Sequence, residues 1–163
     1  MEPLSGIRIL DLTWVMAGPR ATQLLAFLGA ECIKVESQLS PDLFRTDSAS
    51  LGNKRGIYLA FSSMNAGKLS IQLNLTHPGG VRLFRQLVAI SDVVVDNFTP
   101  GTMAKFGLGY DDLKVFNPSI IVASLSSHGA SGPERDYKGY AVQFGPLSGM
   151  SELVGYSDGP PEE

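Results

Sequence analysis

Two short apolar segments joined by a helix-length connection constrain the fold of this chain most. Residues 7–12 (IRILDL) and 31–36 (ECIKVE) each have the apolar character of a strand buried in a sheet. The connection starts with the small-residue turn 15–19 (VMAGP), in which Pro19 suits the first helical position. It continues with an apolar helical face over 21–29, closed by a glycine. Because a parallel crossover needs roughly a dozen residues, this stretch predicts a right-handed βαβ unit.

The rest of the chain continues the alternation of strands and helices. Residues 68–75 alternate strictly between apolar and polar side chains, which predicts a half-exposed strand near a sheet edge. Thr76 is expected to cap the helix that follows. Helices are expected at 78–90, 111–116 and 147–154, strands at 92–96 and 119–125, and long loops at 37–65 and 126–146. This alternation predicts an α/β fold with an open, mostly parallel, doubly wound sheet and helices on both faces.

Three turns follow predicted strands and are expected to form one ligand crevice. They cover residues 15–19, 97–101 and 126–132. Ligands of open α/β sheets bind outside the carboxyl ends of the strands, so these three turns should converge.

Composition limits the kind of ligand and the compartment. A net charge of −3 and a pI near 5.4 give no broad basic surface for nucleic acid, but they allow a local pocket for a small anion. The single cysteine, Cys32, excludes a disulfide framework, favours a reducing compartment and suits a buried strand position. The sequence shows no secretory leader and no apolar run of the roughly 20 residues that a membrane span needs. We therefore expect a cytoplasmic protein.

The candidate binding residues each have an ordinary structural explanation as well. The first turn has no G-x-G-x-x-G motif, so a conventional dinucleotide site is not expected, although a helix start there could hold an anion. Asn97 and Phe98 offer an amide and an aromatic face suited to adenine, or they form only a packed turn. Lys105 and Lys138 could pair with phosphates, or they are solvated charges.

The sequence predicts neither a metal site nor a nucleophilic triad. His77 and His128 have no spacing typical of metal ligands. Ser126, Ser127 and His128 are neighbours only in sequence, and no G-x-S-x-G elbow is present. From the residues alone, the prediction ends at an α/β domain with a crevice for a small anion.

A series of motifs then runs in order from residue 3 to about residue 161. They are PLSGIRILDL at 3–12, AGP at 17–19, LGA at 28–30, IKVE at 33–36, GK at 67–68, SI at 70–71, DNF at 96–98, PG at 100–101, LGY at 108–110 and NP at 117–118. Taken together, they resemble the family III CoA-transferases, the group of formyl-CoA transferase, carnitine CoA-transferase and α-methylacyl-CoA racemase.

The resemblance implies a Rossmann-like large domain, of which residues 1–163 would form the N-terminal part. The family's small domain and C-terminal segment would be absent from this chain. Two long protomers would interlock as a ring-like homodimer, or the chain would pair with a homologous subunit. Coenzyme A or acyl-CoA would be a substrate, not a tightly bound cofactor, and a carboxylic acid would be the acceptor. No nucleic acid and no membrane would be involved.

The resemblance also assigns site residues. The CoA-contacting positions would be Val15, Met16, Leu73, Asn97, Phe98, Lys105 and Lys138. The nucleophilic aspartate would lie just beyond Glu163, past the DGPP element at 158–161, so no catalytic residue is expected in this chain. Tyr140 would be a neighbour of the site. Relatives often carry other residue types at Met16, Ser37, Leu69, Asn74 and Thr76, several of them basic, so weaker phosphate binding is expected here.

The implied activity is the transfer of CoA between an acyl-CoA and a free carboxylic acid through an enzyme-aspartyl intermediate. The chain alone would be inactive. One alternative is an acyl-CoA racemase or isomerase on the same fold, against which Tyr140 argues because it replaces a racemase-like histidine. The other alternative is a non-catalytic CoA-binding subunit.

Overall fold

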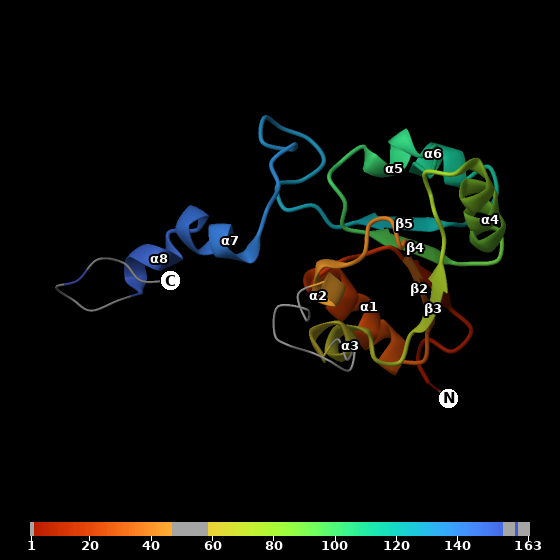
Figure 1. Cartoon of the computed structure of the whole chain (residues 1–163), viewed down its shortest axis with the longest axis horizontal. Helices are drawn as coiled ribbons and strands as arrows, with labels where there is room; N and C mark the ends of the chain where they lie inside the picture. The colour runs from red at the N-terminus through yellow and green to blue at the C-terminus, as the bar shows by residue number, and fades with distance from the viewer. Residues whose placement is uncertain (1, 47–58, 155–158, 160–163) are drawn as a thin grey trace. The chain divides into compact units, whose positions relative to one another are not determined.

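The computed structural model describes residues 2–46, 59–154 and 159, and it divides the chain into two units (Figure 1). The first unit comprises residues 1–125 and the second comprises residues 126–163. Each unit is described below by itself.

The first unit is built on a five-stranded parallel sheet, which confirms the predicted α/β class. Its strands are β1 (Arg8–Asp11), β2 (Glu31–Glu36), β3 (Leu69–Gln72), β4 (Val93–Asp96) and β5 (Ile121–Ser124). The spatial order β3-β2-β1-β4-β5 matches the first five positions of the doubly wound Rossmann arrangement. Successive strands are added on one side of β1 as far as β3 and on the other side from β4 onward, so the strand order reverses between β1 and β4. The predicted edge position of the alternating strand is confirmed, because β3 has only β2 beside it.

Helices cover both faces of this sheet (Figure 1). They are α1 (Ala17–Phe27), α2 (Leu43–Thr46), α3 (Leu59–Asn65), α4 (Pro78–Val88), α5 (Thr102–Lys105) and α6 (Tyr110–Leu113). On one face, Leu25 and Ala26 of α1 pack against Ile9 and Cys32. On the other face, α4, α5 and α6 contribute buried side chains to a larger core around β1, β2 and β4. Alternate residues of β1, β2, β4 and β5 therefore serve two separate cores, whereas β3 contributes only to the larger one.

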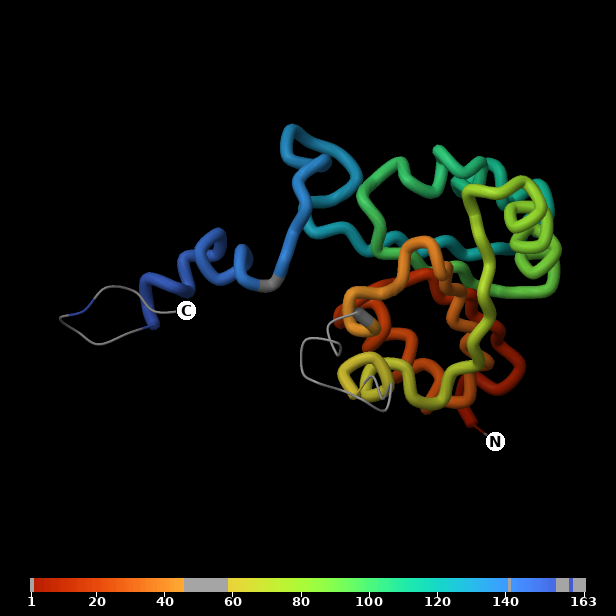
Figure 2. Tube along the Cα trace, viewed as in Figure 1, coloured from red at the N-terminus to blue at the C-terminus, as the bar shows by residue number. Residues whose placement is uncertain are grey.

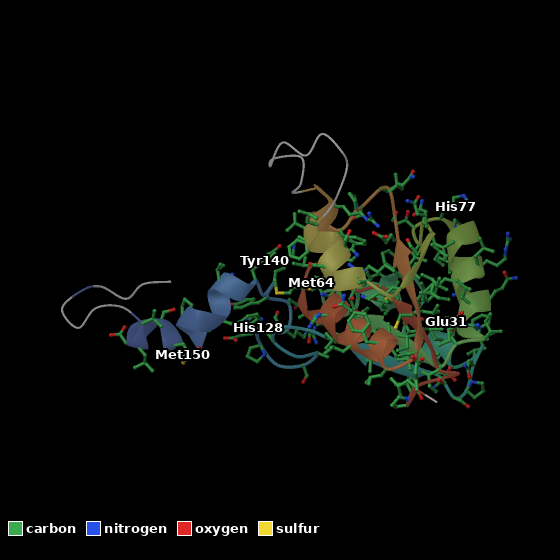
Figure 3. All side chains as sticks on the ribbon, turned by 90° about the horizontal axis from the view of Figure 1, so that it is seen from below. Glu31, Met64, His77, His128, Tyr140 and Met150 are labelled. Carbon is green, nitrogen blue, oxygen red and sulfur yellow. The ribbon has the colours of Figure 1, made fainter. Side chains whose placement is uncertain are left out.

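Helix α4 has an unexpected cap. His77 (Figure 3), and not Thr76, is the N-cap residue. Its Nδ1 accepts the Gly79 N–H at 3.1 Å. The prediction for Thr76 is wrong because its N–H and hydroxyl both donate to Asn74 Oδ1, at 2.9 and 2.7 Å. Phe84 on the inner face of α4 is fully buried, so core packing holds the helix.

Some predicted boundaries differ from the structure. The predicted loop over 37–65 contains α2 and α3, while residues 47–58 lie outside the described residues. Helix α5 was not predicted, and Pro19 is the third residue of α1 instead of the first. Helices α2 and α5 are too short to show helical periodicity in the sequence, whereas the helices predicted at 111–116 and 147–154 are present in shorter form as α6 (Tyr110–Leu113) and α8 (Met150–Leu153).

The second unit carries two short helices, α7 (Ala141–Leu147) and α8 (Met150–Leu153) (Figure 2). Helix α7 contradicts the predicted loop over 126–146, because it begins at residue 141 and tolerates Pro146 near its end. Between residues 126 and 140, the His128 ring makes an edge contact with Tyr137 at 5.9 Å. None of the helices in the described part of the chain is long and apolar enough to cross a bilayer.

Candidate functional site

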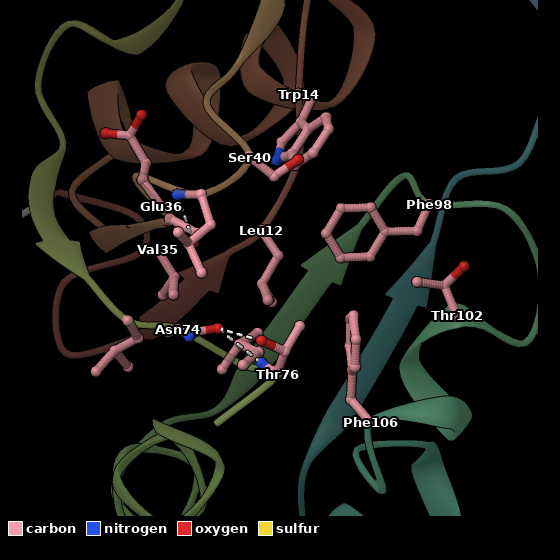
Figure 4. A pocket seen from close by; sticks show the side chains of 14 residues that line it. Leu12, Trp14, Val35, Glu36, Ser40, Asn74, Thr76, Phe98, Thr102 and Phe106 are labelled. Atoms are coloured by element: carbon pink, nitrogen blue, oxygen red, sulfur yellow. Dashed lines mark hydrogen bonds between the residues drawn. The ribbon is translucent and has the colours of Figure 1, made fainter. Parts of the chain in front are cut away.

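A largely apolar pocket of about 200 Å³ lies at the carboxyl ends of β1, β2, β3 and β4 (Figure 4). Its lining residues come from the end of β2 and from the segments that follow these four strands: Leu12, Trp14, Val35, Glu36, Ser37, Leu39, Ser40, Leu73, Asn74, Leu75, Thr76, Phe98, Thr102 and Phe106. This is the place where an open α/β sheet binds its ligand, next to the point where the strand order reverses.

Aromatic rings form one side of the pocket (Figure 4). The Trp14 and Phe98 rings meet edge to face, with centroids 5.5 Å apart and planes at 88°. Phe106, at the end of α5, also lines the pocket. Such a surface suits a flat aromatic ring of a ligand, such as adenine. Phe98 and Leu73 were predicted as site residues, and both line the pocket, whereas Trp14 and Phe106 were missed.

Asn97 ties Trp14, the residue before the first turn, to the turn after β4. Its Oδ1 accepts the Trp14 N–H at 2.8 Å, and its Nδ2 donates to the Trp14 carbonyl at 2.9 Å. The turn after β4 therefore meets the residue that precedes turn 15–19, but none of residues 15–19 lines the pocket. The third turn, residues 126–132, begins in the second unit, so its convergence stays a prediction.

The first turn is strained at Val15, whose φ of 67° lies in the left-handed region. For a residue other than glycine this conformation costs about 1–2 kcal/mol, and it is least expected for a β-branched side chain. The Val15 N–H donates to Oδ2 of buried Asp42 at 3.1 Å. Asp42 was missed because it belongs to a segment without periodicity, 27 residues along the chain.

Within the first unit, four other predicted site residues do not line the pocket: Val15, Met16, Asn97 and Lys105. Met16 is 53% exposed, and Lys105 is exposed at the end of α5. Lys138 and Tyr140 belong to the second unit, where both are exposed and Tyr140 is the N-cap of α7.

The negative charge at the pocket rim is neutralised by a neighbouring arginine. Among the described residues that line the pocket, Glu36 is the ionisable one, and its two carboxylate oxygens each accept a hydrogen bond from Arg45 at 2.7 Å. The Arg45 guanidinium also lies 3.6 Å from the centroid of the Phe61 ring. Because the lining carries no cationic side chain of its own, the pocket suits the uncharged part of a ligand better than its phosphates.

A buried ionic cluster lies beneath the first turn. Asp11 Oδ2 is 2.8 Å from Lys68 Nζ, and Asp11 Oδ1 is 3.6 Å from Lys34 Nζ. The three side chains are at most 1% exposed. Thr13 and Thr22 donate their hydroxyl hydrogens to the same carboxylate at 2.5 and 2.7 Å.

Burial and the mutual charges of the cluster shift the pKa values of Asp11 and Lys34. Burial alone would raise the pKa of Asp11, but the charges of Lys34 and Lys68 and hydrogen bonds from Lys68 and Thr13 hold that pKa below its ordinary value. Burial lowers the pKa of Lys34; Asp11 opposes this effect, and the like charge of Lys68 adds to it. In the described part of the chain, no group of three or more His, Cys, Asp or Glu side chains could hold a metal ion.

Comparison with known proteins identifies relatives over nearly the whole chain. The family model of CoA-transferase family III matches residues 4–163. A succinyl-CoA:glutarate CoA-transferase of Mus musculus is 43% identical over 161 residues, which cover 99% of this chain and 36% of that protein. A succinyl-CoA–L-malate CoA-transferase beta subunit of Chloroflexus aurantiacus is 40% identical, over 98% of this chain and 39% of that subunit.

Solved structures agree with these sequence relatives. A CAIB/BAIF family protein from Brucella suis superimposes with a TM-score of 0.88 at 36% identity, over 99% of this chain and 43% of that one. A Mycobacterium tuberculosis protein gives a TM-score of 0.88 at 37% identity, again over 99% of this chain and 44% of its own. The chain thus spans less than half the length of these relatives.

Proposed function

Since this chain belongs to CoA-transferase family III, we propose that it is part of an enzyme that moves CoA from an acyl-CoA to a free carboxylic acid. The observation that carries the proposal is the aromatic pocket at the strand ends, walled by Trp14 and Phe98. Relatives named for succinyl-CoA, glutarate and L-malate support short dicarboxylic acids as the acyl group and acceptor.

The pocket fits one part of CoA. Pockets for drug-sized ligands measure about 300–1,000 Å³, so a volume near 200 Å³ suits a single ring system. We assign it to the adenine end, which would contact Phe98, Trp14 and Leu73. The pantetheine arm and the phosphates would then lie outside the lining residues.

The other site residues take separate roles in this proposal. Val15 and Met16 would contact the ligand from the first turn, and Asn97 would contact it while holding Trp14. Lys105 and Lys138 would pair with phosphate oxygens, to which a flexible ammonium group is well suited. Tyr140 would stand close to the acyl group.

The chemistry would follow the route of a carboxylate nucleophile. An aspartate located just beyond Glu163 in the whole protein would attack the thioester carbonyl, forming a mixed anhydride and releasing CoA thiolate. The thiolate would attack the anhydride, giving an aspartyl-CoA thioester and the free acid. The acceptor carboxylate would reverse these steps, and backbone N–H groups would stabilise the oxyanions.

The assembly is also part of the proposal. Residues 1–163 would form the N-terminal part of the large domain, and the whole protein would be an interlocked homodimer or would pair with a homologous subunit. The second arrangement is supported by a relative whose name designates it a beta subunit.

Calorimetric titration of the 163-residue chain with CoA tests the site. Phe98→Ala should weaken binding because stacking of a base on an aromatic ring contributes about 1–3 kcal/mol, roughly 5- to 150-fold in Kd. Phe116→Ala, which removes a 43% exposed ring outside the pocket, is the matched control and should bind CoA normally. Equal affinities of the two variants would refute the assignment of the pocket.

A turnover assay tests the position of the nucleophile. The chain is incubated with succinyl-CoA and glutarate, and glutaryl-CoA is sought by mass spectrometry. No product is expected from this chain, because none of its residues is assigned as the nucleophile. Clear turnover would show that a catalytic carboxylate lies within residues 1–163.

A further inference from the structure

The backbone of residues 13–15, which lead from β1 into the first turn, is held by side chains from three other parts of the first unit. The Thr13 carbonyl accepts a hydrogen bond from Lys34 Nζ on β2. The Trp14 N–H and carbonyl are both bonded by Asn97, which follows β4. The Val15 N–H donates to Asp42. The two peptide groups on either side of Trp14 are thus fixed by side-chain hydrogen bonds. The Trp14 side chain between them forms part of the pocket wall.

This support matters because the turn is not held by its own conformational preference. Val15 adopts a left-handed conformation that a valine rarely takes by itself. Such a conformation persists only where the surrounding structure determines it. Losing one support should therefore let the turn move, and the Trp14 ring with it.

Within the buried cluster, the two lysines have different partners. Lys68 Nζ lies 2.8 Å from Asp11 Oδ2 and donates to the Pro19 carbonyl and to Asn65 Oδ1, both at 2.8 Å. Lys34 Nζ is farther from Asp11, at 3.6 Å, and its hydrogen bond goes to the Thr13 carbonyl. Asp42 and Glu36 also act on Lys34 electrostatically, but neither forms an ion pair with it in the described part of the chain.

The charges point to separate roles for the two lysines. Among the described residues, Lys68 is the cation that hydrogen-bonds Asp11 directly, so the carboxylate remains paired if Lys34 is replaced. Removing one partner of a buried ion pair is strongly destabilising when it leaves an uncompensated charge, but here two lysines face one carboxylate, so Lys34→Met leaves Asp11 neutralised by Lys68. The contribution that only Lys34 makes is its contact with the first turn.

We propose that Lys34 is a positioning residue for CoA: from beneath the pocket, its amino group holds the Thr13 carbonyl and so fixes the Trp14 ring beside Phe98. It would do so without touching the ligand. The link to CoA rests on the proposed function, whereas the link to Trp14 order does not.

The test compares Lys34→Met with two other lysine-to-methionine variants of the same chain. Lys68→Met removes the direct partner of Asp11, and Lys114→Met removes an exposed lysine paired with Asp111 on the surface. Three quantities are measured for each: the thermal midpoint, the Kd for CoA by calorimetry, and the fluorescence anisotropy of Trp14, the sole tryptophan of the chain.

Lys34→Met should keep a midpoint close to that of the unaltered chain, lower the Trp14 anisotropy and weaken CoA binding about tenfold, as expected for one lost interaction. Lys68→Met should lower the midpoint strongly, and Lys114→Met should leave all three quantities unchanged. Lys34→Gln, which is polar and one atom shorter than lysine, is made in parallel. It should change Kd and anisotropy in the same direction, and it decides the question if the methionine variant does not fold.

Two results would overturn the inference. One is that Lys34→Met binds CoA and orders Trp14 as well as Lys114→Met does. The other is that Lys34→Met loses as much stability as Lys68→Met while Trp14 in its folded form keeps its anisotropy, which would leave Lys34 a purely structural role. If the unaltered chain binds no CoA, the proposed function fails instead, and the anisotropy comparison still decides whether Lys34 positions Trp14.

Discussion

At the scale of single residues, the first turn depends on Gly18 for space. A Cβ at Gly18 would lie 2.4 Å from Thr13 Cβ. Thr13 is fully buried, and its N–H and hydroxyl both donate to Asp11, so its side chain has no room to withdraw. The glycine is required by this close approach and not by a left-handed backbone.

We therefore predict that Gly18→Ala lowers the free energy of unfolding by about 1–3 kcal/mol, the usual cost of overpacking, and weakens CoA binding. Urea denaturation and calorimetry measure the two effects. Gly109→Ala is the matched control, because a Cβ there meets only ordinary contacts at 3.5 Å, and its cost should be less than about 1 kcal/mol. Equal stability of the two variants would contradict this explanation.

Asp96 gives a prediction about pH. Burial raises its pKa above the ordinary value, against the opposing hydrogen bonds from Ser124 and the Phe98 N–H. The folded protein therefore binds this proton more tightly than the unfolded chain does, so ionised Asp96 destabilises the fold above the raised pKa. That penalty disappears as pH falls through the raised pKa.

Asp96→Asn should accordingly raise the thermal midpoint at pH 7, and the gain should shrink as the pH is lowered toward about 4. Thermal unfolding at several pH values measures the difference. Asp136→Asn, at an exposed aspartate, should show no such trend. A gain for Asp96→Asn that is independent of pH, or a loss at neutral pH, would show that the buried charge is not the cause.

At the scale of elements, α4 docks onto the segment after β3 through Gly80. A Cβ at Gly80 would lie 2.0 Å from the backbone carbonyl oxygen of Asn74, a residue of the pocket lining. The neighbouring Gly79 differs, because its Cβ would meet the His77 ring nitrogen at 3.1 Å, and a side chain can move aside.

The neighbouring glycines therefore make a matched pair. Gly80→Ala should destabilise the chain by about 1–3 kcal/mol and weaken CoA binding, because Asn74 must shift. Gly79→Ala should change stability by less than about 1 kcal/mol, since its better helix propensity offsets the tighter contact. Denaturation curves and CoA titrations measure the two effects. Equal stability and equal CoA affinity of the two variants would contradict the docking explanation.

The sequence predicts long elements better than short ones. The βαβ unit, α4 and the edge strand could be predicted because each has several periodic apolar residues. Helices α2 and α5, of one turn each, could not be predicted, whereas the equally short α6 was predicted because Asn117-Pro118 marks the end of its segment. The site residues follow the same rule. Phe98 could be predicted because it follows a clear strand, whereas Asp42 could not, because it meets Val15 only through tertiary packing. Trp14 could have been found, because it follows the first strand and adjoins the predicted turn.

At the scale of the whole molecule, the second unit shows no core of its own among residues 126–154. Where burial is assigned within residues 126–154, no residue is buried. Large apolar side chains of α7 and α8 are exposed instead, including Val142 at 66%, Leu147 at 67% and Leu153 at 80%. Exposed apolar surface of this extent is typical of a surface that associates with another protein surface.

We predict that the 163-residue chain associates in solution, through α7 and α8. Size-exclusion chromatography with light scattering should show a mass that rises with concentration, and Leu147→Glu combined with Leu153→Glu should reduce that rise. Leu39→Glu, at an exposed leucine of the first unit, is the control. A monomer mass at every concentration would contradict the prediction.

The central claim is that the pocket beside Trp14 and Phe98 receives CoA. Its most direct test is a titration of the unaltered chain with CoA, followed by the fluorescence of Trp14. The account predicts a saturable change in Trp14 emission, with the same Kd as the heat of binding and with loss of the change in Phe98→Ala. Calorimetric binding of CoA that leaves Trp14 emission unaltered would contradict the claim, and so would no binding at all.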